Sequence, residues 1–185
     1  MVVIDKDFVQ KWSQVYDERF RGGKAAIEEK AIRDWLSNQK EPKYLNKEYF
    51  VRLGRWKSAR VTKHYEANDD YEIIKATEAA YLSSDELFKL KLLQTLHGVG
   101  VAVAGTILHY LQPDVFPIFD IHCRKVLKEA TLWSRDKNDD GKQAWLDYLQ
   151  IMRKLSNRLG VSLRNLDKAM FAYDKRGIYL QTSPD

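Results

Sequence analysis

Apolar side chains recur every three to four residues along most of this chain, which is the spacing of one face of an α-helix. From Phe8 to Ser37 the spacing is broken only at Gly22-Gly23, and this predicts two helices in succession. Ser83 followed by Glu86 matches a capping box, which is typical of a helix start. The remaining helices are predicted over 71–81, up to Leu96, from Gly100 to Leu111, after Asp120, before Gly160 and after Ser162.

No stretch of useful length alternates between apolar and polar residues, and no segment repeats. The pattern therefore predicts an all-α fold. A length of 185 residues suits a single domain, 1–185, or two lobes that share a core. Because 44% of the residues are hydrophobic and 12% are aromatic, the chain is too apolar for a disordered protein.

No apolar run reaches the roughly eighteen residues of a membrane span, and the start of the chain lacks the pattern of a secretory signal. Cys123 is the only cysteine, which excludes an intrachain disulfide framework, a four-cysteine zinc site and an all-cysteine iron–sulfur site. We therefore expect a protein of the reducing cytoplasm that has no membrane partner.

The net charge of +5 is concentrated in residues 49–68, called here the basic segment, which hold five Lys and Arg side chains and one carboxylate, Glu66. If this segment is helical from residue 52, a step of about 100° per residue brings four cations and Trp56 onto one arc. Such a face suits phosphate contacts and stacking on a base. The alternative is a solvated helix face with Trp56 packed inward. The candidate contacts are Arg52, Arg55, Trp56, Lys57 and Arg60, with Lys63 on the same arc.

A glycine turn, Leu96-His97-Gly98-Val99-Gly100, separates two predicted helices. Its two glycines free the backbone for unusual dihedral angles and allow another molecule to approach closely. The first N–H groups of the following helix have no intrahelical acceptor and carry partial positive charge, so the turn suits a phosphate oxygen. An ordinary helix–helix turn is the alternative, because short glycine motifs are weak signals.

The second of these helices is followed by Phe116-Pro117-Ile118-Phe119-Asp120, an extended connection that ends in an aspartate at a helix start. The order of hairpin, proline loop and aspartate resembles the helix-hairpin-helix DNA glycosylase superfamily over residues 92–127. The resemblance implies a compact helical bundle that binds double-stranded DNA and removes a damaged base. The residues that match the family's positions are Leu96, Gly98, Val99, Gly100, Ala104 and Asp120.

The resemblance also implies a role for each part. Asp120 would stabilise positive charge on the sugar and activate water, while Gly98, Val99 and Gly100 would bind backbone phosphate. The hairpin carbonyls could hold a monovalent cation, and no other cofactor or metal site is expected. Ala102 stands where members that cut the backbone carry a lysine, so a monofunctional glycosylase without lyase activity is expected.

Three hypotheses remain open from the sequence. The first is DNA glycosylase-like base excision in DNA repair, with Asp120 as the catalytic group of a hydrolase. The second is a non-catalytic nucleic-acid-binding module of the same fold, in which Asp120 is only a helix N-cap, a position that aspartate favours. The third is a helical protein–protein adaptor in which Gly98 and Gly100 merely tighten a turn.

Overall fold

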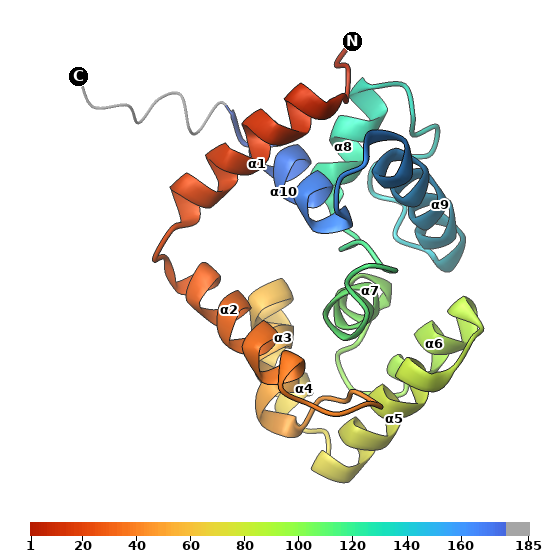
Figure 1. Ribbon diagram of the computed structural model, residues 1–185. Coiled ribbons are helices and arrows are strands. Elements are labelled where there is room, and N and C mark those ends of the chain that lie inside the picture. The colour runs from red at the N-terminus through yellow and green to blue at the C-terminus, as the bar shows by residue number, and fades with distance from the viewer. Residues whose placement is uncertain (177–185) are drawn as a thin grey trace. The chain divides into compact units, whose positions relative to one another are not determined.

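The computed structural model describes residues 1–176, and these contain helices and connecting segments but no strand (Figure 1). The all-α prediction is confirmed. The helices are α1 (Lys6–Phe20), α2 (Lys24–Ser37), α3 (Lys47–Ser58), a short 3₁₀ helix η1 (Ala59–Val61), α4 (Thr62–Glu66), α5 (Asp70–Leu82), α6 (Glu86–Leu93), α7 (Val101–Leu111), α8 (Ile121–Glu129), α9 (Lys142–Leu159) and α10 (Leu163–Asp174).

The chain forms two compact units. The central unit is Gly22–Phe116, and the terminal unit joins residues 1–21 to the chain from Pro117 onward. The boundary therefore lies within the 92–127 segment, between the helix that follows the glycine turn and the loop that leads to Asp120.

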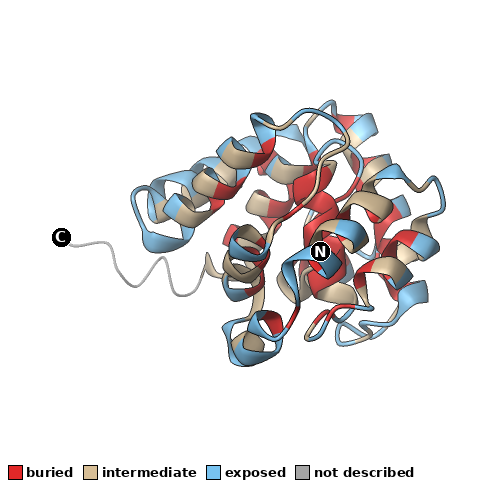
Figure 2. Ribbon diagram, turned by 90° about the horizontal axis from the view of Figure 1, so that it is seen from below, coloured by how far each residue is buried: buried red, intermediate tan, exposed pale blue. Residues whose placement is uncertain are grey.

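The central unit is built around α7. Every residue from Val103 to Leu111 is buried, and α2, α3, α5 and α6 all contact this helix. A helix that is apolar on nearly all sides is stable only when it is buried. Helix α7 is therefore the central helix of this unit's core. In Figure 2 the buried residues lie where helices face one another, and the exposed residues lie on their outer turns.

The terminal unit packs α1 along α10, and α10 in turn contacts α8 and α9. Tyr173 lies between two aromatic side chains of α1, with ring centroids 5.2 Å from Phe8 and 5.3 Å from Trp12. On α9, Trp145 and Tyr148 are fully buried and form the centre of this unit's core. Helices from the two ends of the chain thus share one hydrophobic core.

Several helix ends are those predicted from the sequence. Gly160 adopts the left-handed conformation (φ 65°) after α9, and the Ser162 side chain accepts a hydrogen bond from Asn165 N at the start of α10. The predicted capping box at Ser83 is wrong: the N-cap of α6 is Asp85, whose carboxylate accepts a hydrogen bond from Phe88 N at 2.7 Å. The Ser83 hydroxyl instead accepts one from Asp85 N, which makes a local turn ahead of the helix.

Among the described residues, no helix combines the length and the apolar character needed to cross a membrane.

Candidate nucleic-acid interface

The two glycines of the hairpin have different environments. Gly98 has a positive φ of 83°, whereas Gly100 is extended (φ −84°, ψ 178°) and is the N-cap of α7, with no side-chain capping bond. The Val99 side chain is buried, and its N–H donates to the Leu96 carbonyl at 3.2 Å. Because Gly100 is exposed, a phosphate would meet the hairpin at Gly100 and the first N–H groups of α7, rather than at all three of the predicted residues.

Asn68 fastens the hairpin to the segment that precedes α5. Its side-chain amide donates to the carbonyls of His64, Tyr65 and His97 at 3.0, 3.0 and 3.1 Å, and its Oδ1 accepts from His97 N at 2.6 Å. The residue is 1% exposed. One side chain therefore holds both the end of α4 and the backbone of the turn.

The buried ring of Tyr65 lies between the basic segment and the hairpin. A Cβ atom built on Gly54 of α3 would stand 2.6 Å from one edge of this ring, and a Cβ on Gly98 would stand 2.9 Å from the opposite edge. Both glycines are thus needed for close packing against Tyr65. The consequence is that the basic segment and the hairpin lie side by side in the central unit.

We expect Gly98→Ala to lower the free energy of unfolding by about 2 kcal/mol, because a left-handed alanine costs about 1 kcal/mol and its methyl group would overlap the Tyr65 ring. Gly100→Ala is the matched control: nothing lies within 4 Å of a Cβ there, and the poorer N-cap preference of alanine is offset by the lower entropy of its unfolded chain, so a change within about 0.5 kcal/mol is expected. Urea unfolding followed by circular dichroism measures both. Equal stability of the two variants would contradict the different environments of the two glycines.

The condition for a single cationic arc is not met, because the basic segment is not one continuous helix. Helix α3 ends at Ser58, and Arg60 lies in η1 while Lys63 lies in α4, so these two cations do not share a helix with Arg52. The cause is the packing of Tyr65 against Gly54. In a continuous helix, residues 54 and 65 would be about 16 Å apart at about 1.5 Å per residue, and the chain must turn back to bring them together.

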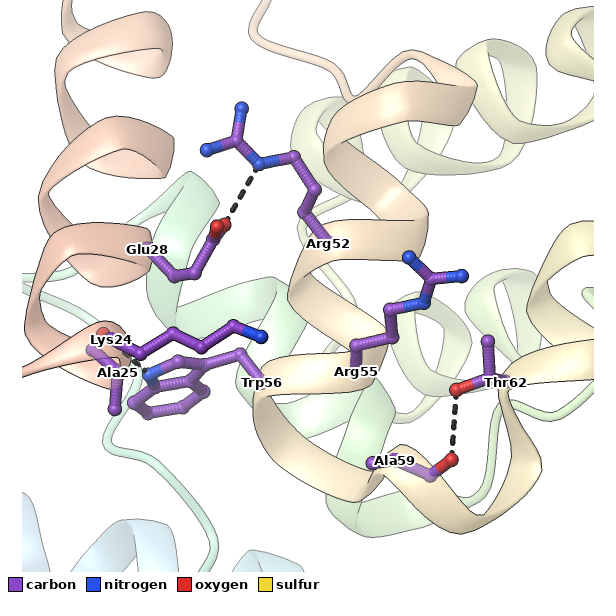
Figure 3. A pocket seen from close by; sticks show the side chains of 8 residues that line it. All are labelled: Lys24, Ala25, Glu28, Arg52, Arg55, Trp56, Ala59 and Thr62. Atoms are coloured by element: carbon purple, nitrogen blue, oxygen red, sulfur yellow. Dashed lines mark hydrogen bonds and ion pairs between the residues drawn. The ribbon is translucent and has the colours of Figure 1, made fainter.

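Because the chain changes direction after Ser58, part of the basic segment lines a pocket of about 810 Å³ (Figure 3). Arg52, Arg55 and Trp56 line this pocket together, whereas Lys57 and Arg60 do not. The other lining residues are Lys24, Ala25, Glu28, Ala59 and Thr62. Lys24 and Glu28 carry no motif and lie more than twenty positions away in the sequence, so only the packing of α2 on α3 reveals them.

Carboxylates accompany both arginines of the pocket. Arg52 donates from Nε to Glu28 at 2.8 Å and from Nη1 to Glu48 at 3.2 Å, and these bonds, the one to Glu28 first, raise the pKa of Arg52. Arg55 donates to Glu66 at 2.5 Å. The pairs hold the guanidinium groups in place and reduce the net positive charge that the segment's composition indicates.

Asp120 lies in the terminal unit as the N-cap of α8, and its Oδ1 accepts a hydrogen bond from His122 N at 2.8 Å. It is half-buried. The His122 ring is held in turn by α10, because its Nδ1 lies 2.5 Å from Asp174 Oδ2, and Lys125 lies 3.5 Å from the same oxygen. The predicted catalytic residue Asp120 thus lies two positions before His122, whose imidazole ring is held in one orientation by Asp174.

The side chains around the start of α8 order the loop that leads to Asp120. Tyr148 donates to the Ile118 carbonyl at 2.9 Å, and the Arg124 guanidinium lies 4.3 Å from the Phe119 ring centroid. Cys123 is fully buried, and its burial raises the pKa of the thiol well above its usual value. A thiol kept protonated in this way is not a nucleophile.

Residues 1–176 contain no group of three or more His, Cys, Asp or Glu side chains that could hold a metal ion. In the hairpin, the carbonyls of Leu96, His97 and Gly100 already accept hydrogen bonds from Val99 N, Asn68 Nδ2 and Ala104 N. A cation needs several oxygen ligands at once. Each of these carbonyl oxygens has a second lone pair, so the monovalent cation implied by the family resemblance stays a prediction.

In comparisons with family models, with curated proteins and with solved structures, nothing matches this chain.

The predicted site residues are distributed over the two units of the chain. The hairpin and the basic segment share the central unit through Tyr65 and Asn68, whereas Asp120 belongs to the terminal unit. The sequence does not reveal the role of Asn68 in holding the hairpin, because its partner His97 lies 29 positions away. No local pattern marks a contact between positions so far apart.

Proposed function

We propose that this protein binds nucleic acid, double-stranded DNA in the first place, through the hairpin and the basic segment. The observation that carries the proposal is the packing of both around Tyr65 in one unit. A helix N-terminus that lacks a side-chain cap lies at Gly100, next to a segment with five cations. Partial positive charge on backbone N–H groups and full charge on neighbouring side chains together favour a phosphate backbone.

We further propose that the bound DNA undergoes monofunctional base excision. The support is the similarity of residues 92–127 to the helix-hairpin-helix glycosylases, together with a half-buried carboxylate at Asp120. Such a carboxylate stabilises the positive charge that develops on the sugar when the N-glycosidic bond breaks. Ala102 offers no amine for a covalent intermediate, so the attacking group is water.

DNA binding is expected to weaken steeply as salt rises, because phosphate contacts release counterions. Arg60 is exposed and lies on η1 of the basic segment. In Arg60→Gln, the slope of log affinity against log salt should be smaller by about one. Fluorescence anisotropy with a labelled duplex at several salt concentrations measures the slope.

The matched control is Arg33→Gln, which removes an exposed arginine of α2 outside the basic segment. Its slope should equal that of the unmodified protein. Binding that is indifferent to salt, or an equal loss in both variants, would refute the proposed interface.

A panel of duplexes that each carry one damaged base tests the enzymatic proposal. The expected result is release of at least one base type, followed by strand cleavage only after alkali, as a monofunctional enzyme requires. If salt-dependent binding persists but no base is released from any duplex, the non-catalytic binding module is the correct assignment. In that case the Asp120 carboxylate serves as the N-cap of α8.

A further inference from the structure

The pocket beside Trp56 differs from a surface that follows a duplex backbone. Its volume of about 810 Å³ falls in the range of about 300–1,000 Å³ that is typical of small-ligand sites. All of its lining residues come from α2, α3, η1 and α4 of the central unit. A B-form backbone offers a convex ridge of phosphates, whereas this pocket has room for a single group that enters it.

Trp56 forms a wall of fixed orientation in this pocket. Its Nε1 donates to the Ala25 carbonyl at 3.2 Å (Figure 3). Its ring meets the Tyr110 ring edge-on at 5.8 Å between centroids. Since the indole is held both by a hydrogen bond and by an aromatic contact, it costs little entropy to stack a planar ligand on it.

Charged side chains line the pocket beside the indole. Arg52 and Arg55 come from α3, and the Lys24 side chain, from the first turn of α2, runs alongside the Trp56 ring in the view of Figure 3. Helix α2 begins after Gly23 without a side-chain capping bond, so its first N–H groups add partial positive charge at the same end. Glu28, held by Arg52 Nε, adds one hydrogen-bond acceptor. These groups favour a ligand with a planar ring, an anionic end and polar N–H or O–H donors between them.

We propose that this pocket binds one unstacked nucleotide that carries a 5′-phosphate. The base stacks on Trp56, the phosphate lies against Arg55, Lys24 and the start of α2, and Glu28 accepts a hydrogen bond from the sugar or base. The inference rests on the proposed function for its ligand class. It gives Arg55 and Trp56 a task separate from the duplex contact proposed for Arg60: they hold a displaced or terminal nucleotide.

A free nucleoside monophosphate and the 5′ end of a strand both offer a base and a phosphate to this pocket. The experiment below distinguishes these two ligands. The ligands are deoxyadenosine 5′-monophosphate, a 5′-phosphorylated single-stranded tetranucleotide, and a fully paired blunt duplex. The indole N–H signal of Trp56, assigned by its loss in Trp56→Phe, reports occupancy in ¹H–¹⁵N spectra. The tetranucleotide should shift this signal at lower concentration than the mononucleotide, because the strand adds backbone contacts.

Ala25→Glu is expected to fold normally while it changes the charge of the pocket. Ala25 is exposed in the first turn of α2, where a carboxylate is favourable for the helix, yet its side chain would place negative charge in the pocket. Affinity for the tetranucleotide should fall about tenfold to a hundredfold, the range expected when one charge-assisted contact is lost. Ala25→Gln, which is similar in size but neutral, should lose clearly less affinity than Ala25→Glu, because it brings the same bulk into the pocket without the charge.

The outcomes distinguish this inference from the proposed function. If the Trp56 signal does not move with either the mononucleotide or the tetranucleotide, or if Ala25→Glu and Ala25→Gln bind equally well, the pocket inference is overturned. Salt-dependent duplex binding could still persist in that case, and the proposed function would stand. A shift with the mononucleotide alone would restrict the site to free nucleotides and overturn its role on a strand.

Discussion

Asp120→Asn is expected to lower base release at least about a hundredfold, the lower bound for removing a general acid–base group, while the stability of the protein hardly changes. Asparagine is as good an N-cap as aspartate, and its side-chain oxygen can still accept the bond from His122 N that caps α8. It cannot carry the negative charge that would stabilise a sugar cation or accept a proton from water. The measurement is single-turnover base release on the lesion that the panel identifies.

Asp120→Ala separates the two roles of this residue. It loses both the carboxylate and the cap, so it should match Asp120→Asn in activity but unfold with about 1 kcal/mol less free energy. For a chain of this length, that is a fall of about 2–4 °C in Tm. If Asp120→Asn retains full activity, the carboxylate is only a helix cap and its proposed catalytic role fails.

Asn68→Ala is expected to cost about 3 kcal/mol of unfolding free energy, because several buried hydrogen bonds lose one partner at once. The affected backbone groups belong to His64, Tyr65 and His97. Because the side chain joins the end of α4 to the hairpin, duplex binding should also weaken at temperatures where the variant is still folded. Urea unfolding and anisotropy measure the two effects.

Asn38→Ala is the matched control for this variant. Asn38 is an exposed residue at the end of α2, where its backbone N–H, and not its side chain, makes the recorded capping bonds. A change within about 0.5 kcal/mol is expected. If both variants lose equal stability, Asn68 does not hold the hairpin.

Features that depend on nearby residues were predictable from the sequence. Helical spacing located most helices, and the ends at Asp120, Gly160 and Ser162 follow from local capping chemistry. The start of α6 was predicted wrongly because Ser83 and Asp85 are both good caps only two positions apart. The choice between them depends on which side chain reaches the first helical N–H groups, and the carboxylate of Asp85 does so.

The path of the basic segment could not be predicted from residues that are close together in the sequence. A uniform step per residue predicts one cationic arc, but Tyr65 packs against Gly54 and turns the chain back after Ser58. The acidic partner Glu28 lies 24 positions from Arg52, so neither the pocket nor the pairing of its arginines could be read from the order of residues. Contacts between distant positions carry no periodic signal.

By itself, the sequence determined that the protein is helical, where its charge is concentrated, and that a glycine pair precedes a helix with an aspartate further on. Only the tertiary structure decided what each glycine does. Gly98 lies against Tyr65 with a positive φ, whereas Gly100 has open space around it and begins α7. The two residues are chemically identical and two positions apart. What separates their roles is the ring of a tyrosine more than thirty positions earlier, which reaches the hairpin only when the core of the central unit forms.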